Sequence, residues 1–278
     1  MTKEDLLNLR IDCLDKGFVR LVDYMGDDSA VVQAARVSYG NGTKSYREDR
    51  GLIRYLMRNR HTSPFEMVEF KFHCRMPIFV ARQWIRHRTA NVNEYSGRYS
   101  EMTDDFYLPD ISQLRHQADD NKQGRSAEVL EDGKAELIMK SMADSQKASY
   151  DEYKSYLSQD LARELARINL PLSAYTEWYW KIDLHNLFHF LKLRLDKHAQ
   201  FEIRIFAEAM AQIIKQVVPI SYEAFEDFIL HSRLFSGLEV EFLKKIVDTK
   251  KINEKALLDL GLSKREAAAM IELFTNKL

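Results

Sequence analysis

Cysteine is scarce in this 278-residue chain, in which only Cys13 and Cys74 occur. Two cysteines are too few for a disulfide framework or a cysteine-based zinc centre. The sequence also has no apolar run long enough to span a membrane, and its first residues lack the apolar core of a signal peptide. We therefore expect a cytoplasmic protein that has no membrane partner.

Glycine and proline are sparse too, with 10 and 5 residues, and no Pro/Gly/Ser-rich stretch divides the chain. Apolar residues make up 45% of the sequence, which is enough for one sizeable core. Neither sign of charge is in excess, because 41 Lys and Arg face 42 Asp and Glu, a formal net charge of −1. This balance argues against a general nucleic-acid binder, so any cationic site must be local.

One local cluster is present at residues 82–100, RQWIRHRTANVNEYSGRYS, with four arginines, one histidine and a single carboxylate, Glu94. Guanidinium groups make paired hydrogen bonds to phosphate oxygens. The interleaved Asn, Tyr and Ser side chains add polar and aromatic surface. The pattern indicates a pocket for phosphates and planar heterocycles, and a solvated helix face followed by a surface loop is the plain alternative.

The clearest strand is residues 68–76, where apolar side chains alternate with charged ones up to Pro77. Residues 17–24 predict a second strand, and Asp28 is expected to cap a helix. A helix is also expected from residue 78 to about 88, which would put the RHR run at its end. Its inward-facing residues are predicted to be Ile78, Phe79, Ala81 and Ile85.

The second half of the chain is expected to be mainly helical. Residues 110–134 are polar and predict a mobile insertion. A long helix should follow and end near Pro171, and another should run from 184 to 218. We expect an α+β fold, a mixed or antiparallel sheet flanked by long helices, with one main domain over 1–228 and a helical C-terminal extension over 229–278. The stripe of the long helix is predicted to be Leu157, Leu161, Leu165 and Ile168.

The predicted helix 184–218 carries histidines and an arginine beside an apolar stripe. At 100° per residue, Arg194 and His198 lie at the edge of this stripe, whereas His185 and His189 point nearly the opposite way. Histidines four residues apart can share a zinc ion, but no HExxH motif or third ligand accompanies them. We predict no metal site, and packing rather than binding for the aromatic run 175–180.

Four segments resemble one known family. The run RHRTANVNEYS is similar to the RHR, seven residues, Ser signature of the flavin-dependent thymidylate synthases. The segments HTSPFE, ARINLPL and LKLRLDKHAQFEI agree with the same family in order and spacing, so the resemblance covers roughly 17–228. It implies reductive methylation of dUMP to dTMP, with methylenetetrahydrofolate as one-carbon donor and NADPH as reductant through bound FAD. It also implies a homotetramer with its sites at subunit interfaces.

The resemblance assigns roles to particular residues. Arg194 is expected to be catalytic, as the cation that polarises the uracil ring, and His61 is implicated by its SPFE context. The residues expected to bind dUMP are Gln83, Arg86, Glu94, Ser96, Gly97, Arg98, Arg167 and Arg194. The residues expected to bind FAD are Ser63, Arg86, His87, Arg88, Glu94, Asp183, His189 and His198.

No enzyme nucleophile is expected. Ser96 has no evident base at a suitable spacing, so it is assigned to substrate positioning. Cys74 falls on the buried face of its predicted strand. Two other functions use the same arginines: a nucleic-acid-binding module, which would bind with steep salt dependence and no flavin, and a structural oligomer in which arginines only bridge subunits.

Overall fold

The structure, a computed structural model, describes residues 3–37, 46–119 and 122–275. Its centre is a five-stranded sheet in the order β1-β2-β3-β7-β4, in which all neighbours are antiparallel. The strands are β1 Arg10–Cys13, β2 Gly17–Met25, β3 Glu69–Pro77, β7 Tyr175–Asp183 and β4 Asn91–Glu94. The α+β class and the antiparallel sheet are thereby confirmed.

β3 is the central strand, as its alternation predicts. Phe70, Phe72, Cys74 and Met76 are fully buried on one face, and the residues between them are partly exposed on the other. A strand with period-two alternation packs one face on a core and leaves the other wetter. Pro77 closes the strand and precedes α4, Ile78–Trp84, as its N-cap.

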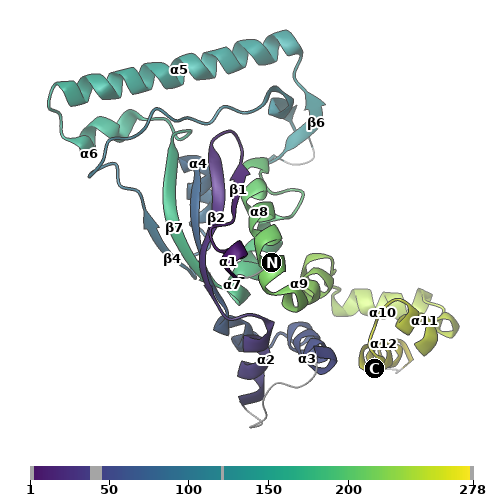
Figure 1. Ribbon diagram of the computed structural model, residues 1–278. Helices are drawn as coiled ribbons and strands as arrows, with labels where there is room; N and C mark the ends of the chain where they lie inside the picture. The colour runs from purple at the N-terminus through teal and green to yellow at the C-terminus, as the bar shows by residue number, and fades with distance from the viewer. Residues whose placement is uncertain (1–2, 38–45, 120–121, 276–278) are drawn as a thin grey trace.

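Helices α7 and α8 cover one face of the sheet (Figure 1). The two helices span Leu184–Arg194 and Phe201–Val217. Between them and the sheet, Trp84 of α4 stacks on Phe190 with ring centroids 5.0 Å apart and meets Trp180 edge-on at 5.3 Å. Burial of these large rings removes much apolar surface from water. The packing interpretation of the aromatic run agrees with burial of Tyr175, Trp178 and Trp180, although Tyr179 is 43% exposed.

The helix from 78 ends earlier than predicted, at Trp84. The inward residues are Val80, Ala81 and Trp84, whereas Ile85 is 36% exposed, so its predicted inward packing is wrong. The reason is that Trp84 fills the space under the sheet, and the chain turns away directly after it. The RHR run therefore lies in a turn between α4 and β4.

Asp28 was expected to cap its own helix, but the cap of α2 (Asp28–Arg36) is Asp27, whose side chain accepts from Ser29 N at 2.8 Å. Asp28 instead accepts from the backbone nitrogens of Ile220 and Ser221, each at 2.8 Å. These amides open α9, Pro219–Phe225. Asp28 thus ties two helices that are distant in sequence.

Residues 110–134 are more regular than predicted. They contain the turn Ile111–Gln113 and a hairpin of β5, Arg115–Gln117, and β6, Arg125–Val129. The hydrogen bond of Arg125 to the buried Glu202 of α8 fastens the hairpin to the main body. The described part of this segment is therefore regular in structure, and its mobility stays a prediction.

The long helix α5 spans Asp132–Ser158 and stops before the predicted end. Asp160 has a φ of 62°, a left-handed conformation that an α-helix does not continue through. The chain restarts as α6, Arg163–Ala166, and the short turn Arg167–Asn169. The predicted single stripe is wrong beyond the break, because Leu161, Leu165 and Ile168 are 39%, 52% and 70% exposed.

The remaining elements are short helices around the sheet and the helices of the C-terminal extension. α3, Tyr46–Arg58, packs near α2 and α9, and short helices precede β1 and β3, at Lys3–Leu6 and Ser63–Met67. After the π-helical turn Glu226–Leu230 the extension forms α10, Gly237–Ile246, the turn Thr249–Lys251, α11, Glu254–Asp259, and α12, Lys264–Thr275. Gly261 has a φ of 95°, a conformation that glycine adopts without strain.

The division into 1–228 and 229–278 stays a prediction. None of the helices in the described ranges is long and apolar enough to cross a membrane.

Candidate active site

The RHR run presents its three side chains differently because the chain turns after Trp84. Arg86 and Arg88 are exposed, whereas His87 is partly buried against α7. The His87 ring meets the Phe190 ring edge-on, with centroids 4.9 Å apart. The turn therefore leaves two guanidinium groups free for a ligand and uses the imidazole to contact the helix.

His87 joins the motif to Arg194 at the end of α7. Arg194 Nε donates to His87 Nε2 over 3.0 Å, so the neutral ring carries its proton on Nδ1. Burial, Arg194 and His189 together lower the pKa of His87 to about 4, and burial lowers the pKa of Arg194. At neutral pH His87 is thus an uncharged acceptor that orients a cation.

His189 lies on the other flank of His87, with ring centroids 5.9 Å apart. Arg194 and His189 are expected to point in nearly opposite directions from one helix. They nevertheless share a neighbour, because the His87 ring contacts both of them. Side chains 140° apart on a helix can share a neighbour when that neighbour sits on the face between them.

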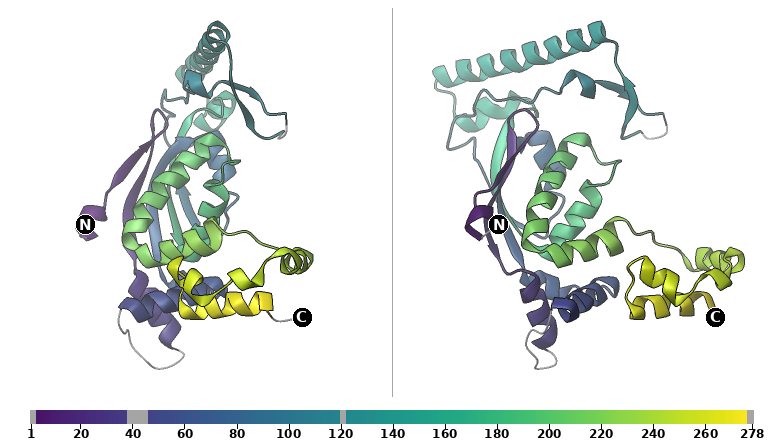
Figure 2. Two further views of the ribbon diagram at one scale, coloured as in Figure 1. Left: turned by 90° about the vertical axis from the view of Figure 1, so that its right-hand side faces the viewer. Right: turned by 45° about the vertical axis from the view of Figure 1, so that its right-hand side comes forward.

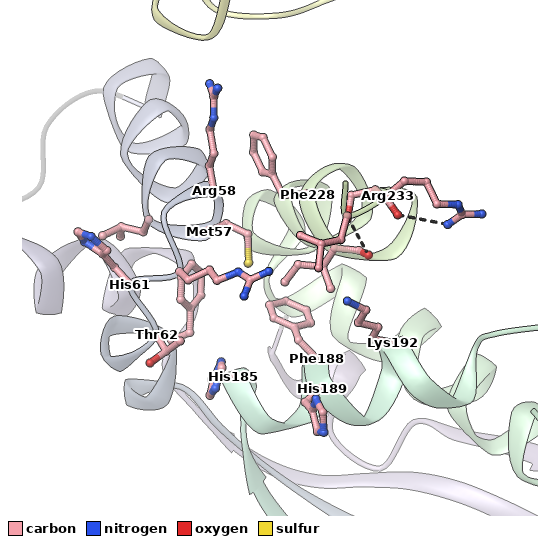
Figure 3. A pocket seen from close by; sticks show the side chains of 16 residues that line it. Met57, Arg58, His61, Thr62, His185, Phe188, His189, Lys192, Phe228 and Arg233 are labelled. Atoms are coloured by element: carbon pink, nitrogen blue, oxygen red, sulfur yellow. Dashed lines mark hydrogen bonds between the residues drawn. The ribbon is translucent and has the colours of Figure 1, made fainter. Parts of the chain in front are cut away.

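A cavity of about 470 Å³ lies between the end of α3, α7 and the segment 228–234. His189, which contacts His87, forms part of its wall. Figure 3 shows His185 and Lys192 rising from α7, with Met57 and Phe188 facing one another near the middle. Among the described residues no carboxylate lines the cavity, so its basic groups are not neutralised within it. The basic and imidazole residues of its lining are Arg58, Arg60, His61, His185, His189, Lys192 and Arg233.

A second cluster brings the predicted nucleotide segment to the predicted Arg167. A Cβ on Gly97 would lie only 3.1 Å from Arg167 Cδ, so the missing side chain lets the two segments approach. Arg98 forms an ion pair with Glu164 at 3.1 Å. Ser96 Oγ accepts from the Arg98 backbone nitrogen at 3.3 Å. Residues 96–98 and Arg167, which the sequence assigns to one nucleotide site, therefore lie next to each other in the structure.

Glu94 and Gln83 are two further residues of the predicted nucleotide set. Glu94 Oε1 accepts from Thr176 Oγ1 at 2.8 Å, which holds the exposed end of β4 against β7. Gln83 Oε1 is buried and has no hydrogen-bond partner in the part of the chain that the structure describes. An unpaired buried acceptor is costly, so Gln83 suits a position where a ligand supplies the donor.

Over the ranges that the structure describes, no hydrogen bond or ion pair links Arg194 to Ser96, Arg98 or Arg167, so the two clusters make no direct polar contact there. His198 lies after the end of α7, hydrogen-bonded through Nδ1 to Asp196 at 2.8 Å, rather than beside Arg194 on a continuing helix as predicted. Asp183 is the N-cap of α7 and accepts from Asn186 N at 2.9 Å.

Sequence reasoning missed several cavity residues. Arg60 and Lys192 were not singled out, and His185 was considered as a metal ligand and as part of the stretch 183–189 that the resemblance assigns to the flavin site of a neighbouring subunit. The sequence does contain a pattern that could have identified two of them, because His185, His189 and Lys192 are spaced at four and three residues and so share a helix face. No group of three His, Cys, Asp or Glu in the described chain is arranged to hold a metal ion.

An α+β protein whose helices place arginine, lysine and imidazole groups around one cavity belongs to a class suited to anionic, ring-bearing ligands. The model of the thymidylate synthase complementing protein family matches residues 20–220. The chain belongs to this family.

Similar proteins agree over nearly the whole chain. A flavin-dependent thymidylate synthase of Thermus thermophilus is 56% identical over 254 residues, covering 91% of this chain and 92% of the relative. A flavin-dependent thymidylate synthase of Ehrlichia ruminantium is 50% identical over 274 residues, which cover 99% of this chain and 91% of the relative. The crystal structure of the UMP/dUMP methylase PolB from Streptomyces cacaoi with 5-Br dUMP is 37% identical, with a TM-score of 0.72 over 80% of this chain and all of that one.

Proposed function

We propose that this protein catalyses the reductive methylation of dUMP to dTMP, with methylenetetrahydrofolate as one-carbon donor and NADPH as reductant through bound FAD. The observation that carries the proposal is the Arg194–His87 hydrogen bond beside the carboxylate-free cavity. Relatives at 50% to 56% identity bear the name flavin-dependent thymidylate synthase, which supports the same reaction here.

The cavity residues fit a flavin nucleotide. A diphosphate requires cations, and a cavity with Arg58, Arg60 and Lys192 but no carboxylate offers them. An isoalloxazine ring requires flat apolar surface, which Phe228 offers at the cavity wall. When bound, the flavin supplies hydride-transfer chemistry. Of the residues predicted to bind FAD, His189 lines this cavity, with His61 beside it in the wall. We propose that the others complete the flavin site from outside the cavity: Ser63, Arg86, His87, Arg88, Glu94, Asp183 and His198.

We assign dUMP to the second cluster. Arg86, Arg98 and Arg167 are suited to a phosphate dianion because guanidinium groups bind it in a bidentate manner. Gly97 leaves room for the backbone to approach the nucleotide, and Ser96 positions it. The buried Gln83 acceptor suits an N–H donor such as a pyrimidine provides. Glu94 completes the proposed set.

Arg194 activates the uracil ring in this proposal. A cation at the N3/O4 edge stabilises the enolate-like form, which makes C5 nucleophilic. His87 holds the guanidinium through Nε, which leaves the two terminal nitrogens for the substrate. Partial burial of Arg194 strengthens its field because less water screens it.

No side chain is assigned as a nucleophile. Cys74 is fully buried, and burial raises the pKa of its thiol well above the usual value. A protonated, inaccessible thiol is a poor nucleophile. Ser96 is placed by its backbone contact rather than by a neighbouring base. Methyl transfer therefore relies on an activated pyrimidine rather than on a covalent enzyme adduct.

We further propose that the working form is a cytoplasmic homotetramer with each site shared between subunits. Arg194 and the Gly97–Arg167 pair belong to one reaction in this proposal but have no direct contact within the described chain. A neighbouring copy that brings its own cluster to Arg194 would complete the site.

A flavin spectrum and a tritium-release assay test the function together. The purified protein should be yellow or become so with FAD, and it should release tritium from 5-tritiated dUMP only when NADPH and methylenetetrahydrofolate are present. Dithionite-reduced enzyme should be reoxidised on addition of both substrates. A colourless protein that FAD cannot reconstitute, or tritium release that ignores NADPH, would refute the proposal.

A further inference from the structure

The last helix of the chain, α12, lies beside α3 (Figure 2). Two adjacent residues of α12 contact two adjacent residues of α3. Glu266 Oε1 accepts from Arg54 at 2.9 Å from Nη2 and 3.2 Å from Nε. The Arg265 guanidinium lies over the Tyr55 ring, 4.4 Å from its centroid. These contacts join the C-terminal extension to a helix whose end lines the cavity.

The contact between Glu266 and Arg54 leads, through Arg54, to Phe228 in one wall of the cavity. Arg54 is only 7% exposed and also pairs with Asp227 at 2.5 Å and Glu223 at 3.4 Å. Its guanidinium lies 4.6 Å from the centroid of the Phe228 ring, and Phe228 lines the cavity. A buried cation needs its carboxylates, so Glu266 helps to hold the group on which Phe228 packs.

The contact between Arg265 and Tyr55 leads, through Tyr55, to His61 in another wall of the cavity. The Tyr55 ring that Arg265 covers meets the His61 ring edge-on, with centroids 5.7 Å apart. His61 lines the cavity. Arg265 and Glu266 therefore each lie one side chain away from a residue of the cavity wall, through Tyr55 and Arg54.

We propose that α12 positions the walls of the flavin cavity, with Glu266 acting through Arg54 on Phe228 and Arg265 acting through Tyr55 on His61. The naming of the ligand rests on the proposed function, whereas the positioning itself does not. Side chains locked by such supporting contacts keep a binding geometry that loose ones lose. Arg265 and Glu266 are positioning residues in this proposal, because neither touches the cavity.

The first test needs no ligand. Amide hydrogen exchange of residues 56–62 and 228–234 is measured in the full-length protein and its variants without FAD. We expect Arg265→Ala to speed exchange in 56–62 by about threefold, the size of a surface cation–π contact, and to shift the His61 imidazole proton signal. Arg265→Lys should retain part of the effect. The control Lys264→Ala removes an exposed cation from the same helix and should change neither signal.

The second test is FAD binding, followed by flavin fluorescence. We expect the dissociation constant to rise about threefold in Arg265→Ala and about tenfold in Glu266→Gln, because the latter weakens a buried ion pair. The KM for dUMP should stay unchanged. Glu266 also caps α12 through the Ser263 nitrogen at 2.7 Å, so Arg265→Ala remains decisive if the Gln variant unravels the helix.

The outcomes separate the two claims. Unchanged exchange at both walls in Arg265→Ala and Glu266→Gln overturns the positioning role, whatever the protein binds. Faster exchange with an unchanged FAD dissociation constant would leave the positioning role standing and overturn its link to flavin binding. A wild-type protein that fails to bind FAD removes the proposed function, and the exchange data still decide whether α12 orders the walls.

Discussion

At the scale of the residue, the Arg194–His87 pair carries the proposed chemistry. Removal of a donor that stabilises developing charge costs about 2.7–4 kcal/mol of transition-state stabilisation. We expect Arg194→Ala to lower the rate of tritium release from 5-tritiated dUMP by ~100- to 1000-fold. The comparison is Arg10→Ala, which removes an exposed arginine of β1 and should leave the rate near that of the wild type. A near-wild-type rate in Arg194→Ala would exclude the role assigned to this cation.

His87 predicts a pH dependence of stability. Burial, Arg194 and His189 lower its pKa to about 4, from the ordinary value of 6.5. Between these two values the unfolded chain binds more protons than the native one, so the free energy of unfolding falls as the pH drops from 6.5 to 4. We expect this residue to contribute on the order of 2 kcal/mol, less than the full shift implies because the ring is only partly buried.

Urea unfolding at pH 7 and pH 4.5 measures this contribution. His87→Gln retains a hydrogen-bond acceptor but does not titrate, so its stability should fall less than that of the wild type between the two pH values. Equal losses in both proteins would show that the proton uptake lies elsewhere.

At the scale of the element, Gly97 sets how closely the β4 loop approaches the turn that bears Arg167. An added Cβ would lie 2.9 Å from Met102 Sδ and 3.1 Å from Arg167 Cδ. Both neighbours are flexible side chains, so we expect Gly97→Ala to fold, to displace Arg167, and to raise the KM for dUMP about tenfold. Gly133→Ala is the matched control, because a Cβ there meets nothing within 4 Å. An unchanged KM in Gly97→Ala would separate Arg167 from the nucleotide site.

Asp28 predicts a cost in stability rather than in activity. Its carboxylate satisfies the first amides of α9 from the start of α2, and a lost cap costs about 0.5–2 kcal/mol. Asp28→Ala should lower the free energy of unfolding by about 1–2 kcal/mol. Asp151→Ala removes only an exposed i, i+4 partner of Lys147 and should change it by less than about 0.5 kcal/mol. Equal values for the two variants in urea titrations would mean that the α2–α9 tie is energetically unimportant.

At the scale of the whole molecule, the separation of the two clusters predicts complementation between subunits. Arg98→Ala and Arg194→Ala should each be nearly inactive alone. Because a shared site takes one cluster from each of two copies, mixed oligomers of the two variants contain some sites with both arginines intact. Co-refolded mixtures should therefore recover part of the activity, whereas mixtures of separately folded oligomers should not. Failure to recover after confirmed subunit exchange would place the whole site in one chain.

The local pattern of the sequence predicted β3 well and placed the RHR run after a helix, although that helix ends earlier than predicted. β3 alternates in nine residues, and alternation follows from strand geometry alone. β7 was missed as a strand because its tryptophans suggested an aromatic run, although Thr176, Trp178, Trp180 and Ile182 alternate as buried positions. Helix ends were the least predictable. Trp84 and Asp160 end α4 and α5 through packing and a left-handed backbone, neither of which a hydrophobic period encodes.

The sequence by itself determined the α+β class, the family signature and the residue types available for a phosphate- and ring-binding site, because these depend on composition, period and spacing along the chain. Only the tertiary structure decided that His87 inserts between Arg194 and His189, that Gly97 lies against Arg167, and that α12 reaches Arg54 and Tyr55. Each of these contacts joins segments 70 or more residues apart. Such pairings are selected by the packing of the whole core, which no local pattern of residues specifies.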